Sequence, residues 1–169
     1  LLDGHFDVVV AMMYNEFPSE GLDREWLFDD KLVLVMRAGH PLAEQTDLRP
    51  EDLLDEDWVF ADSNTWNQHR LRLYFEQAGL PVPVGKMECR DPAVLKAVVA
   101  SSDYLSVIAK LGVEREVKQG VLHAIDIPSP LMQRPIGIVR RTGEPMSPAI
   151  KSFVQIAHEL CGPSLMAAR

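Results

Sequence analysis

Short apolar runs rich in β-branched residues alternate along this chain with amphipathic segments that begin at helix-capping residues. The runs with the length and composition of strands are residues 6–11, 31–37, 58–61, 84–89, 104–109, 121–127 and 136–140. Asp91-Pro92 and Ser147-Pro148 each place a capping side chain before a proline of a first helical turn. Strands that alternate with helices predict an α/β protein with mostly parallel sheets.

The helices are expected between these runs, at residues 48–54, 66–78, 92–101, 110–119 and 147–159. Residues 12–25 contain Pro18 and Gly21, which predict a loop. The helix at 66–78 is expected to turn Leu71, Leu73, Phe75 and Ala78 inward. Sheets of this kind bind ligands beyond the carboxyl ends of their strands, where helix N-termini converge.

Composition narrows the class of protein. The chain has 169 residues, of which 47% are hydrophobic, and this is enough to form the core of one domain or of two small lobes. Its net charge of −8 argues against binding of nucleic acid by this part of the protein. The chain carries no apolar run near the roughly 20 residues that cross a bilayer, and no signal peptide. Leu1 and Leu2 read as the end of an element, so a helix is expected before them and the sequence is interpreted as a fragment.

Several stretches, in co-linear order to about residue 160, resemble LysR-type transcriptional regulators. They are Leu2 to Val10, Leu32-Val33-Leu34-Val35-Met36 with His40-Pro41-Leu42-Ala43, Trp58-Val59-Phe60, residues 70–80, Val98-Val99-Ala100, Gly120-Val121-Leu122 and Arg134-Pro135-Ile136-Gly137-Ile138-Val139-Arg140. The pair of stretches at residues 32–36 and 40–43 is the one most specific to this family. Ser102 to Leu105 and Arg134 to Gly137 are most similar to the branch that includes galactose-binding-protein regulators. Tyr104 and Ala109 depart from the glycine and proline of many members.

The resemblance implies a two-lobed type II periplasmic-binding-protein-like fold, N-terminally truncated. By analogy, lobe I contains residues 1–55 and 131–161, lobe II contains residues 56–130, and residues 162–169 form a frayed tail. The family's winged helix-turn-helix, its linker helix and the first strand and helix of lobe I have no counterpart in this sequence.

The implied function is effector sensing in a cytoplasmic transcription factor. A small-molecule inducer (a sugar, a sugar acid, or an aromatic or other organic acid) would bind the inter-lobe cleft and shift the DNA-binding state of a homodimer or homotetramer. DNA contact would be made only through the helix-turn-helix, and neither a membrane nor a cofactor is expected as a partner.

The best physical candidate for effector binding is Ser63-Asn64-Thr65, where a strand ends and a helix begins. Backbone N–H groups, the positive end of the helix dipole, hydroxyls and an amide would meet there, which suits a carboxylate or a sugar hydroxyl. The alternative is that Asn64 or Thr65 is only the N-cap, and the two roles are compatible.

Other candidates are less specific. Trp66 could offer a stacking face or anchor the core. Ala11, Met12 and Met13 follow the first strand and, in the family, line the opposite wall of the cleft; methionines adapt to irregular ligands, although ordinary packing is the alternative. Ile108 and Ala109 could form a wall in lobe II or simply pack as strand residues.

Two other functions were weighed: a periplasmic solute-binding protein of the same fold, and an enzyme on that fold such as a dehydratase. Enzyme motifs are absent from the sequence: it has no H-x-x-x-H pair, no G-x-S-x-G and no glycine-rich phosphate loop. His158 and Cys161 could be half of a metal site, but a surface histidine beside a buried thiol is the preferred interpretation. No catalytic residue and no metal ligand are therefore predicted.

Overall fold

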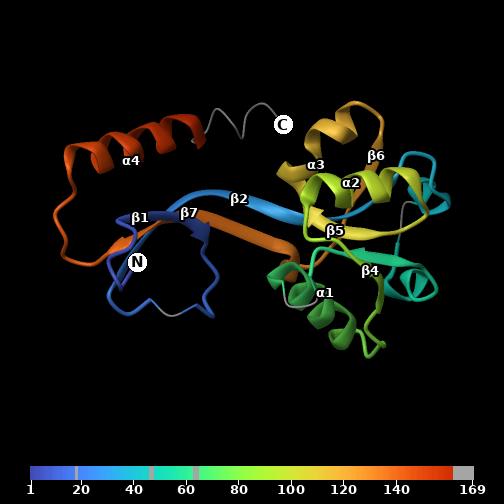
Figure 1. Cartoon of the computed structure of the whole chain (residues 1–169). Coiled ribbons are helices and arrows are strands. Elements are labelled where there is room, and N and C mark those ends of the chain that lie inside the picture. The colour runs from blue at the N-terminus through green and yellow to red at the C-terminus, as the bar shows by residue number, and fades with distance from the viewer. Residues whose placement is uncertain (18, 46–47, 63–64, 162–169) are drawn as a thin grey trace. The chain divides into compact units, whose positions relative to one another are not determined.

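The computed structural model describes residues 1–17, 19–45, 48–62 and 65–161 (Figure 1). Its packing divides the chain into two compact units. The first unit is Leu1–Asp30 together with the chain from Arg134 onward, and the second unit is Lys31–Gln133. The chain therefore passes from one unit to the other after Asp30 and again after Gln133.

The second unit is built on a sheet around the second half of strand β2 (Leu22–Arg37). This half pairs antiparallel with β5 (Ser106–Ala109) and with β6 (Leu122–Asp126). Strand β3 (Trp58–Phe60) pairs parallel with β4 (Gly85–Glu88), and Trp58 forms a parallel bridge with Leu105 just before β5. Strands β3, β4, β5 and β6 therefore run in one direction and β2 runs in the other.

Helices cover both faces of this sheet. Helix α1 (Trp66–Gln77) lies on one side, and α2 (Pro92–Ser101) and α3 (Lys110–Lys118) lie on the other (Figure 1). Successive residues of β2 point to opposite faces, so one face receives Leu32, Leu34 and Met36 and the other receives Val33 and Val35. The first set packs with Leu71 and Phe75 of α1, and the second with Leu95, Val99 and Val113 of α2 and α3.

Proline opens three short 3-10 helices in this unit: η1 (Pro41–Glu44), η2 (Pro50–Leu53) and η3 (Pro130–Met132). Helix α2 begins as the sequence predicted, because the Asp91 carboxylate accepts the N–H groups of Ala93 and Val94 at 2.8 and 3.1 Å.

The first unit contains a separate set of strands. Strand β1 (Val8–Met12) pairs antiparallel with β7 (Gln133–Arg141), with Val8 opposite Arg140 and Met12 opposite Ile136. Strand β7 lies between β1 and β2. Helix α4 (Pro148–Cys161) is tied to β2 by His158, whose Nε2 lies 2.5 Å from a carboxylate oxygen of Glu25.

Several predicted features were wrong. The β1–β7, β2–β5 and β2–β6 ladders are antiparallel, against the expected mostly parallel sheets, because β2 and β7 run against their neighbours. Strand β2 begins at Leu22, inside the predicted loop, and the helix expected at 48–54 is the 3-10 turn η2. Val10 of β1 is exposed, as is Ala78 at the end of α1.

The two compact units divide the chain differently from the predicted lobes at residues 31–55 and 131–133, all of which the resemblance placed with lobe I. Residues 31–55 belong to the second unit because the apolar half of β2 is buried between α1 and the α2–α3 pair. The lobe boundaries stay a prediction, and the tail at 162–169 lies outside the described residues. Among the described residues, no helix is both long and apolar enough to span a membrane.

A substitution at Gly137 would test how closely β7 packs against Met13 and Glu25 in the first unit. A Cβ at this position would lie well inside van der Waals contact with the Met13 sulfur and the Glu25 carbonyl oxygen. We expect Gly137→Ala to lower the free energy of unfolding by about 1–3 kcal/mol in urea titrations. The matched control is Gly112→Ala in α3, where a Cβ meets Ile108 at an ordinary 3.6 Å and removing a helical glycine should add about 0.5–1 kcal/mol. Equal effects of the two substitutions would contradict this packing.

The Lys96–Glu116 ion pair joins α2 to α3 and should make stability depend on pH. The Lys96 ammonium lies 2.5 Å from the Glu116 carboxylate, and this hydrogen bond lowers the pKa of Glu116. A lowered folded-state pKa stabilises the native protein above the unfolded-state pKa and is lost as acid protonates the carboxylate. We expect Glu116→Gln and Lys96→Met to flatten the loss of unfolding free energy between about pH 5 and pH 3. An unchanged pH slope in both variants would exclude this contribution.

Candidate functional site

Two helices begin directly after neighbouring parallel strands in the second unit. Val59 donates its N–H to the Leu105 carbonyl at 3.0 Å, and Leu105 donates to the Asp57 carbonyl at 2.8 Å, so β3 and the segment that enters β5 run side by side. Helix α1 follows β3 after a short connection, and α3 follows β5 at once. The N-termini of both helices therefore follow strands whose carboxyl ends meet at one edge of the sheet.

Thr65 is the N-cap of α1. Its hydroxyl oxygen accepts the Gln68 N–H at 3.4 Å and donates to the Asp62 carbonyl at 3.1 Å, while its carbonyl accepts the His69 N–H at 3.0 Å. These hydrogen bonds are those of an N-cap, the role that the sequence predicted as one alternative for Thr65. Ser63 and Asn64 lie outside the described residues, and effector binding by all three stays a prediction.

Trp66 lies in a cluster on the first turn of α1. Its ring centroid is 5.0 Å from the ring of His69, and the Arg70 guanidinium carbon lies 5.2 Å from it, over the ring. Arg70, one turn further along the helix, is buried, which is rare for an arginine. Trp66 was predicted from the sequence as an effector-binding candidate, whereas His69 and Arg70 were not, although spacings of three and four residues place all three on one helix face.

Ile108 and Ala109 end β5, where they pair with Val33 and Leu32 of β2. Ile108 is half-buried and packs into the α2–α3 face of the core. Ala109 precedes Lys110, whose ammonium lies 3.8 Å from the Asp126 carboxylate. Lys110 was missed by the sequence analysis, and it places a cation at the start of α3.

The other predicted wall lies in the first unit, at the end of β1. Ala11 pairs with Gly137 and Met12 with Ile136, and the Met13 N–H donates to the Pro135 carbonyl at 2.8 Å. The Met13 side chain lies against the bare backbone of Gly137, so its thioether takes part in the packing of the first unit. Contact of these three residues with an effector stays a prediction.

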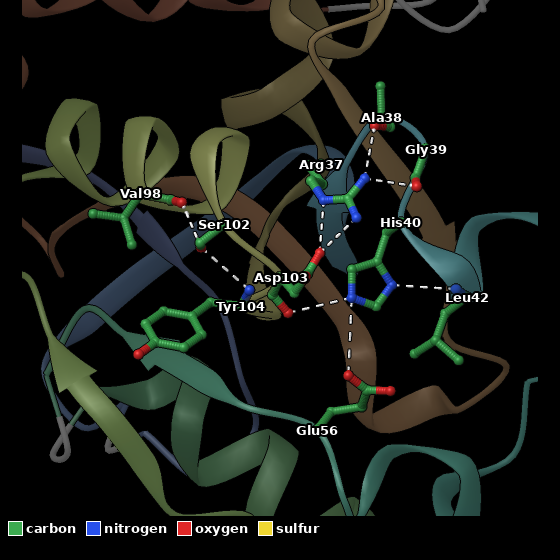
Figure 2. A network of polar contacts seen from close by, with 10 residues as sticks. All are labelled: Arg37, Ala38, Gly39, His40, Leu42, Glu56, Val98, Ser102, Asp103 and Tyr104. Carbon is green, nitrogen blue, oxygen red and sulfur yellow. Dashed lines mark hydrogen bonds and ion pairs between the residues drawn. The ribbon is translucent and has the colours of Figure 1, made fainter.

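His40, the first residue of the most family-specific stretch, is 2% exposed and belongs to the polar network in Figure 2. Its Nδ1 accepts the Leu42 N–H at 3.2 Å, which caps η1 and leaves the ring proton on Nε2. Nε2 then donates to the Asp103 carbonyl at 3.2 Å and lies 3.8 Å from Glu56. The imidazole therefore fastens η1 to the loop that leads into β5.

Arg37 completes this network from the end of β2 (Figure 2). Its Nη2 lies 2.6 Å from the Asp103 carboxylate, and its Nη1 donates to the Gly39 carbonyl at 2.6 Å. The Ser102 hydroxyl donates to the Val98 carbonyl at 2.7 Å and accepts the Tyr104 N–H at 3.2 Å. These bonds fix the turn between α2 and β5, and so position the edge at which α3 begins.

Metal-ligating side chains do not cluster in the described part of the chain. No group of three histidine, cysteine, aspartate or glutamate side chains there could hold a metal ion. His158 contacts Glu25, and the Cys89 thiol donates to the Asp91 carbonyl at 3.5 Å. Cys89 and Cys161 are both free thiols.

Helix N-termini gathered at strand ends are a common place for small molecules to bind in α/β folds. The family model described as LysR substrate binding domain matches residues 1–162. The chain belongs to this family, which confirms the resemblance drawn from the sequence.

Curated relatives agree with this assignment. The transcriptional regulator GalR of Pseudomonas putida is 28% identical over 146 residues, which are 86% of this chain and 36% of GalR. MetR of Escherichia coli is 26% identical over 157 residues, covering 93% of this chain and 48% of MetR. The chain thus spans less than half the length of these relatives.

Solved structures confirm the fold as that of LysR regulatory domains, the type II periplasmic-binding-protein-like fold. The regulatory domain of Synechocystis PCC6803 CcmR in complex with 2-PG has a TM-score of 0.81 at 18% identity, covering 95% of this chain and 76% of that one. The effector binding domain of QuiR in complex with shikimate has a TM-score of 0.74 at 18% identity, covering 95% and 74%.

The His40 network predicts a structural role that can be measured. We expect His40→Ala to lower the free energy of unfolding by about 1–3 kcal/mol, because it strips a buried N–H and a carbonyl of their partner. The control is His5→Ala, whose side chain is 79% exposed and should change stability by less than about 0.5 kcal/mol. Similar losses in both variants, measured by chemical denaturation, would refute the role assigned to His40.

Proposed function

We propose that this chain is the effector-binding part of a LysR-type transcriptional regulator. The observation that carries the proposal is the family match over residues 1–162, and the helix N-termini gathered beyond β3 and β5 support it as a place where a small polar molecule could be held. The CcmR and QuiR domains are bound to 2-PG and shikimate, which supports a small-molecule effector here.

The proposed mechanism is a population shift. An effector that binds one arrangement of the regulator more tightly than another moves the equilibrium by the difference in its two affinities, and that bias is transmitted to DNA binding. DNA would be held by a helix-turn-helix domain outside these residues, consistent with the −8 charge of this part. A homodimer or homotetramer in the cytoplasm is proposed as the working form.

The curated relatives named above are transcriptional regulators. This supports the regulatory reading over the two alternatives weighed from the sequence, a solute-binding protein of a transporter and an enzyme on the same fold. The galactose-binding-protein-regulator branch stays a prediction, as do the individual effector residues.

The test is a ligand screen on the full-length regulator against sugars, sugar acids and aromatic acids. We expect at least one compound to raise Tm by several degrees and to change operator retention in a gel-shift assay, because a ligand that binds only the native state stabilises it. If no compound changes either Tm or operator retention, the proposed function is wrong.

Two N-cap variants would then test whether the start of α1 takes part in effector binding. Thr65→Val and Ser147→Ala each remove an N-cap hydroxyl, in α1 and α4 respectively, at a similar cost of about 1 kcal/mol. Only Thr65→Val is expected to weaken binding of the compound found in the screen, by at least about threefold, because it removes a polar group at the proposed site. Equal affinities in both variants, measured by calorimetry, would remove Thr65 from the site.

A further inference from the structure

Asp30 and Arg134 form a buried ion pair in the first unit. The Arg134 Nη1 lies 3.3 Å from an Asp30 carboxylate oxygen, and the two side chains are 16% and 4% exposed. Each residue stands where the chain passes between the two compact units. The pair therefore ties β2 to β7 where both strands leave the first unit.

The guanidinium of Arg134 is incompletely used by this contact. An arginine carries five N–H donors, and its Nε and Nη2 together form an edge that fits a carboxylate bidentately. Within the described part of the chain, the Arg134 Nε is buried and has no hydrogen-bond partner. A buried, unpaired N–H costs about 1–3 kcal/mol, so its presence calls for a functional explanation.

The position of Arg134 suggests that explanation. Its neighbour Pro135 accepts the Met13 N–H at 2.8 Å, which places Arg134 beside the end of β1, the wall predicted from the sequence to meet an effector. A second arginine, Arg24, donates to the Tyr14 carbonyl at 2.9 Å just beyond Met13. Two guanidiniums thus lie near the end of β1, and the Asp30 carboxylate pairs with that of Arg134.

We propose that the effector is an organic acid and that Arg134 binds its carboxylate through the Nε edge, while Asp30 holds the guanidinium at Nη1. This inference rests on the proposed function and deepens it, since it selects acids from the wider set of sugars and acids. An arginine that binds a carboxylate bidentately discriminates strongly against a neutral analogue, because the analogue leaves the buried Nε–H without a charged acceptor.

The first experiment compares acids with matched neutral compounds on the full-length regulator by calorimetry. The probes are shikimate, galactonate and benzoate, paired with methyl shikimate, galactose and benzamide, together with inorganic phosphate as a second anion. We expect at least one acid to bind at least about tenfold more tightly than its neutral partner, a difference of one hydrogen-bonded charge. Binding of phosphate alone, of neutral compounds equally well, or of no acid would each overturn the proposal.

Variants then locate the binding residue. Arg134→Gln should weaken binding of the acid at least about tenfold, and Arg134→Lys should weaken it less. If Arg134→Gln fails to fold because Asp30 loses its arginine partner, the double variant Asp30→Asn with Arg134→Gln removes both charges and should show the same loss. Arg115→Gln on the exposed side of α3 is the control and should bind like wild type. Wild-type affinity in the double variant would overturn the proposal.

Asp30→Asn separates binding from a purely structural role. The substitution removes a negative charge near the proposed carboxylate, so the acid should bind severalfold more tightly while Tm of the unliganded protein falls. A merely structural pair would lower Tm and leave the affinity unchanged, an outcome that counts against the proposal. An operator response to a neutral sugar alone would also overturn it and leave the proposed function standing, whereas no response to any small molecule would overturn both.

Discussion

Burial of the second half of β2 on both faces is the constraint on which the second unit depends. Residues 32–36 are all buried, with alternate side chains supporting α1 on one face and α2 with α3 on the other. Because β5 and β6 flank the same segment, their positions follow from it. The start of α3 is in turn fixed by β5, so the proposed site at the strand ends is built on this one apolar run.

The same strand shows why part of the fold was predictable. A continuous apolar run at 32–36 is visible in the sequence because burial on both faces requires every residue to be apolar. The start of the strand, residues 22–25, was predicted to be a loop because its polar residues are matched by distant partners: Glu25 meets His158 and Asp23 meets Arg140. Local patterns do not reveal such pairs, since they exist only once β7 and α4 have returned to β2.

In the candidate site, too, the features set by local sequence were predictable, and those set by strand register were not. The beginning of α1 was predicted because capping is local, and Thr65 contacts only residues within three or four positions. The relation of Met13 to Gly137 and Pro135 depends on the antiparallel register of β1 and β7, which the expectation of mostly parallel sheets excluded. Arg134 was therefore read only as part of a family motif, without its place beside the end of β1.

The most family-specific stretch turns out to support the scaffold. His40 uses Nδ1 to hold the Leu42 N–H and Nε2 to hold the Asp103 carbonyl, so neither nitrogen is available to a ligand. The requirement is for one tautomer in a buried position and is independent of which effector binds. Family membership can thus be recognised from residues that fix β5, whereas the proposed choice of effector rests on Arg134, which lies in the first unit, outside the network of Figure 2. This explains how one fold can accept chemically different effectors.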